Sequence, residues 1–188
     1  MPRAKSDDKR SAILSAAIRL IATEGLGVAT ATIAKEARIS NGSLFTYFET
    51  KANLFNELYL ELKSEMAMAA FKGFPPQAEL RDQFSHVWSN WMSWAVRNHD
   101  KRRVLAHLGA SDEITPASRA AGHKIMAGIA ELLERSRAKG PIRDAPIAFV
   151  VAIMNSLSDA TMDFMAQDPA NADRHRALGF DALWRVVS

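Results

Sequence analysis

Apolar residues recur at intervals of three and four along most of the chain, which is the spacing of a helix with one buried face. Ile13, Ala17 and Ile21 show this spacing first, and Gly25 follows them as a natural helix stop. The pattern predicts four helices in the first part of the chain: from a Ser6 cap to Gly25, over residues 31–37, over residues 42–48, and from a Thr50 cap to about Gly73.

The rest of the chain shows the same helical pattern in longer segments. Prolines, glycines and capping residues mark the ends of these segments. The predicted helices cover residues 77–98, 101–108, 115–140, 144–167 with Asp144 as the cap, and 172–187. We find no run that alternates apolar and polar residues as a half-buried strand would. The predicted fold class is therefore all-α.

Charge changes this picture by its position in the chain. Residues 1–51 contain eight Lys or Arg and five Asp or Glu, so the whole net charge of +3 lies there. A basic region of this kind suits a polyanionic partner, although an accident of composition explains the charge equally well.

The sequence also lacks the usual signs of export or membrane insertion. It has no cysteine, no signal-peptide pattern, and no apolar run longer than residues 146–154. A bilayer crossing needs about 20 apolar residues. We therefore expect a cytoplasmic protein with no membrane partner.

The two short helices over residues 31–48 have the size of a helix-turn-helix, with Ala37 to Ser40 as the turn. In such a motif the second helix lies in the major groove of DNA, and its first residues reach the base edges. Short polar side chains gather at the start of this second helix. Gly42 adds a position where the backbone can come close to DNA because it has no Cβ.

The stretch over residues 33–51, IAKEARISNGSLFTYFETK, closely resembles the signature of the TetR/AcrR family of bacterial transcription regulators. Arg38 departs from it, because the family usually has glycine at this left-handed turn. The loop after Gly25 is about one residue shorter than usual, so Thr30 caps the next helix or the cap is lost at Ala29. The resemblance implies DNA contacts by Lys35, Arg38, Ser40, Asn41, Gly42, Ser43, Phe45, Thr46, Tyr47 and Lys51.

The resemblance further implies an N-terminal three-helix DNA-binding domain over residues 1–51 and a helical ligand-binding and dimerisation domain over residues 52–188. Aromatic, methionine and interrupting polar residues are candidates for a small-molecule pocket, although plain core packing explains them as well. These ligand candidates are Trp88, Trp91, Met92, Met126, Asn155 and Asp159. The last helix resembles the dimer interface of the family, with Phe180, Leu183 and Trp184 on its apolar stripe.

The predicted function is a homodimeric repressor that leaves a near-palindromic DNA operator when an unidentified small molecule binds. A family member that activates transcription or acts without a ligand is the main alternative, and a protein that coats DNA without sensing is another. No nucleophile motif, phosphate-binding glycine loop or metal-ligand spacing supports an enzyme, a cofactor or a metal site.

Overall fold

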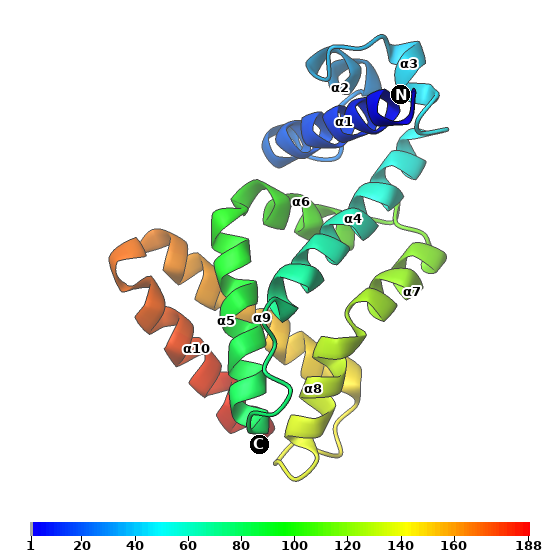
Figure 1. Ribbon diagram of the computed structural model, residues 1–188. Helices are drawn as coiled ribbons and strands as arrows, with labels where there is room; N and C mark the ends of the chain where they lie inside the picture. Colours follow the sequence, from blue (N-terminus) through cyan, green and yellow to red (C-terminus); the bar gives the residue numbers. More distant parts are fainter. Residues whose placement is uncertain (1) are drawn as a thin grey trace. The chain divides into compact units, whose positions relative to one another are not determined.

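The computed structural model describes the backbone of residues 2–188 and the side chains of residues 7–188. The described residues form helices joined by turns and loops, with no strand among them, so the predicted all-α fold class is confirmed (Figure 1). In chain order the elements are α1 (Pro2–Glu24), α2 (Thr30–Glu36), α3 (Asn41–Phe45), α4 (Lys51–Phe71), α5 (Leu80–Arg97), α6 (His99–Gly109), α7 (Pro116–Ile125), α8 (Ala127–Arg137), α9 (Ile147–Gln167), the 3₁₀ turn η1 (Pro169–Asn171) and α10 (Ala172–Val187).

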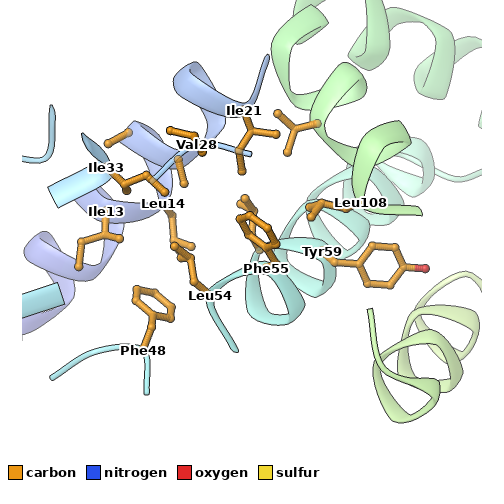
Figure 2. Close-up of a cluster of buried hydrophobic side chains, with 14 of the residues drawn as sticks. Ile13, Leu14, Ile21, Val28, Ile33, Phe48, Leu54, Phe55, Tyr59 and Leu108 are labelled. Atoms are coloured by element: carbon orange, nitrogen blue, oxygen red, sulfur yellow. The ribbon is translucent and has the colours of Figure 1, made fainter. Parts of the chain in front are cut away.

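The chain forms two compact units, which we describe separately. The first unit contains the chain up to Lys63 together with Asn98–Gly122. Its core is one apolar cluster in which α1 packs on α2 and α6 (Figure 2). Its fully buried side chains include Ile13, Ile21, Ile33, Leu44, Phe48, Leu54, Phe55, Leu58, Val104 and Leu108.

Polar contacts tie the segment between α6 and α7 to α4 within this first unit. The buried Asn56 amide donates to the carbonyls of Ala52 (2.7 Å) and Glu113 (2.8 Å), and its oxygen accepts from the Thr115 N–H (2.9 Å). Residues distant in sequence therefore belong to this unit. The predicted domain boundary between residues 51 and 52 differs from the limits of this unit, and it stays a prediction.

The second unit contains Ser64–Arg97 and His123–Ser188. In it α5 packs on α8, α9 and α10, and α9 packs along α10. This last contact is close because Gly179 lies against Thr161: a Cβ at position 179 would come within 2.1 Å of the Thr161 hydroxyl oxygen.

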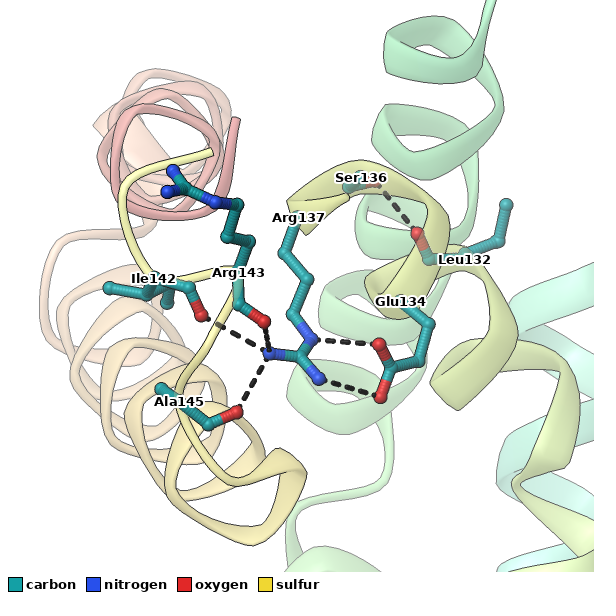
Figure 3. Close-up of polar contacts among 7 residues, drawn as sticks. All are labelled: Leu132, Glu134, Ser136, Arg137, Ile142, Arg143 and Ala145. Carbon is teal, nitrogen blue, oxygen red and sulfur yellow. Dashed lines mark hydrogen bonds and ion pairs between the residues drawn. The ribbon is translucent and has the colours of Figure 1, made fainter. Parts of the chain in front are cut away.

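The Arg137 guanidinium holds the connection between α8 and α9 (Figure 3). It donates to both carboxylate oxygens of Glu134, at 2.8 and 3.0 Å, on one side. On the other side it donates to the carbonyls of Ile142 (3.1 Å), Arg143 (2.7 Å) and Ala145 (2.8 Å). The ion pair with Arg137 lowers the pKa of the Glu134 carboxyl below its ordinary value.

Most predicted helices are confirmed, and three details are wrong. Ser6 is not a cap, because α1 already begins at Pro2. The predicted helix over 115–140 is two helices, because the backbone at Met126 leaves helical geometry (φ −89°, ψ 6°). Asp144 does not cap α9, since that helix begins at Ile147 after an extended Pro146.

Candidate nucleic-acid interface

The turn between α2 and α3 is a Schellman motif closed by an arginine. The Ile39 N–H donates to the Ala34 carbonyl and the Arg38 N–H to the Lys35 carbonyl, both at 3.0 Å. Arg38 has φ 57°, in the left-handed region, so the predicted left-handed turn is present with arginine in place of glycine. Such a backbone costs a non-glycine residue roughly 1 kcal/mol. At the other end of α2, Ala29 provides no side-chain cap.

Ser40 caps α3, as predicted. Its hydroxyl accepts from the Ser43 N–H at 3.1 Å and lies 2.8 Å from the Ser43 hydroxyl. Thr46 donates its hydroxyl to the Ser43 carbonyl at 2.7 Å. Leu44 lies in the core of the first unit. The cap and the core contact together fix which side of α3 faces outward.

The outward side of α3 carries short polar side chains and one aromatic ring. Asn41, Gly42 and Thr46 are exposed, and the Phe45 side chain is 42% exposed. Tyr47, just after the helix, is half-buried against the core. An exposed phenylalanine beside hydrogen-bonding groups suits a partner that offers both methyl groups and polar edges, as the DNA major groove does.

Gly42 has no structural reason to be glycine. A Cβ at this position would meet no atom closer than the Ser40 hydroxyl oxygen at 4.0 Å, and the backbone does not have a positive φ. Glycine costs a helix about 1 kcal/mol relative to alanine. Because no Cβ occupies the space above Gly42, another molecule can approach the backbone closely there.

Four basic side chains of the first unit differ in whether they have an ion-pair partner. Arg10 binds Glu57 and Glu61, both at 2.9 Å, which raises its pKa above the ordinary arginine value, and Arg19 binds Glu36 at 2.9 Å. Lys35 and Arg38, by contrast, are exposed next to the turn and have no ion-pair partner within residues 2–188.

Lys51 differs from Lys35 and Arg38, because its ammonium has a partner within the chain. It donates to the Leu26 carbonyl at 2.8 Å and lies 5.3 Å from the centre of the Phe55 ring. Lys51 thus holds the loop after α1 against α4. Its predicted contact with DNA stays a prediction.

Residues 13–58 match the family model described as "Bacterial regulatory proteins, tetR family". This match covers the capped α3, the turn and the core beneath them. The first part of the chain therefore carries the DNA-binding region of the tetR family. It contains the helix-turn-helix of these regulators, and the resemblance stated for residues 33–51 is confirmed.

Solved structures of transcription regulators resemble nearly the whole chain. A protein from Shewanella sp. PV-4 assigned to the family is 28% identical, with 94% of this chain and 96% of that chain covered and a TM-score of 0.84. A regulator from Marinobacter aquaeolei VT8 is 22% identical, with 98% of each chain covered and a TM-score of 0.82. The regulator FadR from Bacillus subtilis, solved with stearoyl-CoA, is 19% identical, with 95% and 97% covered and a TM-score of 0.68.

The predicted ligand residues do not form one site in the structure. Trp88 and Met92 are buried in the core of the second unit, where the Trp88 indole N–H donates to the Arg176 carbonyl at 3.0 Å. Asn155 and Asp159 instead lie exposed on α9. The interpretation that they interrupt a buried face is wrong, because the buried face of α9 is formed by other residues, namely Val150, Met154, Ser158, Thr161, Met162 and Met165.

Of the two further ligand candidates, one lies in the same core and the other lies apart from it. Trp91 is buried beside Trp88, edge to face, with ring centres 6.1 Å apart. Met126 is half-buried at the break between α7 and α8. The described residues also show no group of three or more His, Asp or Glu side chains that could hold a metal ion.

The predicted dimer residues require a correction. Phe180 and Leu183 are buried inside their own chain, where Phe180 packs against Phe84 at 6.0 Å, so they offer almost no surface to a second copy. Trp184 is half-buried and stacks on Phe180. The exposed large apolar residues of α9 and α10 are others, and the sequence reasoning missed them: Ile147, Phe149, Phe164 and Leu178.

A signal for these residues is present in the sequence. From Ile147 to Ile153 α9 is apolar on every side, which is more than one buried face requires. Within residues 2–188, α9 is also the one helix long and apolar enough to cross a membrane, with a mean hydropathy of 1.3. One such helix is weak evidence for a membrane span, since core helices of soluble proteins pass the same test.

Proposed function

We propose that this tetR-family regulator is a homodimeric repressor that binds a near-palindromic operator and leaves it when a small molecule binds. The observation that carries the proposal is the outward side of α3, where Gly42 leaves open space between exposed polar residues. A helix that reads the major groove needs such a side, because backbone and short side chains must approach the base edges.

The contacts divide into two kinds in this proposal. Asn41 is exposed, and its side chain can pair with both major-groove edges of adenine. Thr46 uses its hydroxyl proton within α3, so it offers lone pairs and a methyl group, and Phe45 offers apolar contact to a thymine methyl. Of the remaining predicted contacts, Tyr47 and the cations Lys35, Arg38 and Lys51 serve the phosphates.

The second copy binds through the outer side of α9 and α10. Phe149 and Phe164 are each 58% exposed, and Leu178 is 56% exposed. Small exposed residues on α9, Ala148, Ala152, Ser156 and Ala160, follow one another at intervals of four and permit close helix contact. Two copies related by a two-fold axis would present two α3 helices to half-sites about 34 Å apart.

The effector would act through the second unit. FadR, a relative by fold, was solved with stearoyl-CoA, which supports a ligand role for this fold but does not identify the ligand here. Helix α4 extends from Lys51 next to the DNA-binding motif into the second unit, so a ligand that shifts α4 can change the spacing of the two α3 helices. The size of the response is limited by the difference in ligand affinity between the two conformations.

Selection of binding sites from a random duplex library tests the proposal. Purified protein is incubated with the library at moderate salt, and bound duplexes are recovered and sequenced. We expect an inverted repeat of two short half-sites. Tight, salt-sensitive binding that yields no motif would instead favour a protein that coats DNA without reading it.

The regulatory direction is tested in a reporter strain in which the selected operator lies within the promoter. Repression predicts reporter output that rises when the gene for this protein is deleted. Output that falls on deletion would identify the alternative, a family member that activates transcription.

A further inference from the structure

The second unit has a surface hollow of about 400 Å³ at the N-terminal end of α5 and the C-terminal ends of α8 and α10. These helix ends lie side by side in Figure 1. Three basic side chains line the hollow, Arg81 from α5, Arg135 from α8 and Lys139 just after it, with Glu79 as the acidic residue among them. None of the predicted DNA or ligand residues lies in it.

The basic groups of this hollow are incompletely neutralised. Arg81 binds Asp181 at 2.6 Å, outside the lining. Arg135 has a single long hydrogen bond, 3.4 Å to the Gln83 side-chain oxygen, and Lys139 has no ion-pair partner among the described residues. After Glu79 and Asp181 are counted, one positive charge remains, and several N–H groups still lack an acceptor.

The hollow also has an aromatic wall. The Trp184 ring stacks on Phe180 with ring centres 6.0 Å apart and an interplanar angle of 30°, and the Arg81 guanidinium lies 5.7 Å from the Phe180 ring centre. Trp184 is half-exposed, and its indole N–H has no hydrogen-bond partner within residues 2–188. The stacking fixes Trp184, so it presents a rigid apolar surface beside the cations.

We propose that this hollow binds a small organic anion that carries both an aromatic ring and a carboxylate or phosphate group. The ring would lie on Trp184 and Leu80, and the anionic group would accept hydrogen bonds from Arg135 and Lys139. The volume is at the lower end of the range of ligand sites, about 300–1,000 Å³, which suits a ligand with one ring. This proposal goes beyond the proposed function and holds whether or not the anion affects DNA binding.

Calorimetric titration of the full chain with phenyl phosphate tests the site, with benzyl alcohol and inorganic phosphate as probes that lack the anion or the ring. We expect one phenyl phosphate per chain with a Kd of about 1 mM or tighter, and both other probes at least tenfold weaker. No binding of phenyl phosphate at millimolar concentration would overturn the proposal, and equal binding of inorganic phosphate would overturn the role of the ring.

Matched variants locate the binding. The double substitution Arg135→Gln with Lys139→Gln should weaken phenyl phosphate binding at least tenfold, whereas Lys72→Gln with Lys124→Gln, two exposed lysines of the same unit outside the hollow, should leave it unchanged. Thermal unfolding of both variants verifies that they fold. Equal effects of the two double variants would show that phenyl phosphate binds elsewhere, which contradicts the proposal.

Discussion

Helices α3 and α9 both have an exposed side, and the two sides have opposite chemistry. The α3 side shows short polar side chains, a glycine and a phenylalanine that is 42% exposed. The α9 side extends along a helix of 21 residues and shows Ile147, Phe149 and Phe164 between alanines. The polar groups of α3 can form hydrogen bonds with a partner in place of water. The apolar side of α9 is unfavourable in free energy as long as it is exposed to water.

This difference indicates two kinds of partner for the same chain. Base edges and phosphates require donors, acceptors and close backbone approach, which α3 offers around Gly42. A second protein surface requires apolar area and small residues, which α9 offers. Substitutions can therefore disturb the two sides separately.

Charging the α9 side should have the largest effect. The double substitution Phe149→Glu with Phe164→Glu should convert the dimer to a monomer, because carboxylates would be buried in an apolar interface. Loss of the second half-site contact should lower operator affinity about 100-fold or more. Sedimentation velocity measures the association, and fluorescence anisotropy measures DNA binding.

Met68→Glu provides the control for this experiment, since Met68 is 69% exposed and belongs to α4. It should leave both the dimer and operator affinity unchanged. A dimer that survives the double substitution would show that the two copies meet through another surface.

Gly42→Ala should separate stability from DNA binding. A methyl group at this position meets open space, so the chain should gain roughly 0.5–1 kcal/mol of unfolding free energy from the better helix former. The same methyl group should lower operator affinity about tenfold by keeping the backbone away from DNA.

Gly109→Ala in α6 is the matched control, because a Cβ there also meets nothing within 4 Å. It should raise stability without changing DNA binding. Urea unfolding and anisotropy give the two quantities, and equal DNA affinity for the two variants would remove Gly42 from the interface.

Arg38 should have a smaller effect, of an electrostatic kind. Arg38→Asn keeps a residue that tolerates the left-handed turn but removes the charge, so operator affinity should fall a few-fold for all DNA sequences. The slope of log affinity against log salt should decrease by about one. An unchanged slope would mean that Arg38 points away from the phosphates.

The smallest effect concerns acid stability in the second unit. The lowered pKa of Glu134 stabilises the fold fully above its ordinary value of 4.5, and this contribution is lost as the pH falls through the lowered folded-state pKa. Glu134→Gln should therefore be less stable than the parent at neutral pH and equally stable in strong acid. Glu131→Gln, on the same helix, should show no such convergence in urea unfolding at a series of pH values.

The sequence predicted α2, the turn and α3 well because their signals are local. The Ser40 cap and the left-handed Arg38 turn depend on neighbours within five residues. The break at Met126 has no such signal, since the helical spacing of apolar residues continues across it. Patterns over neighbouring residues therefore predict one continuous helix where the structure has α7 and α8.

The predicted interfaces of the second unit failed for a related reason. Periodicity shows that Phe180 and Leu183 share a stripe, but it does not show which partner covers that stripe. In the structure α5 covers it, through Phe84 and Trp88. Likewise Asn155 and Asp159 are polar breaks in an apolar helix, and which side of α9 is buried depends on where α5 and α10 pack.

The central claim, that α3 reads the major groove, is tested most directly with modified operators. In the selected motif, 7-deazapurines remove an acceptor from the major groove, and inosine in place of guanine removes an amino group from the minor groove. We expect 7-deazapurines in the half-sites to lower affinity about tenfold, while inosine changes it less than about twofold. Sensitivity to inosine with indifference to 7-deazapurines would contradict this claim.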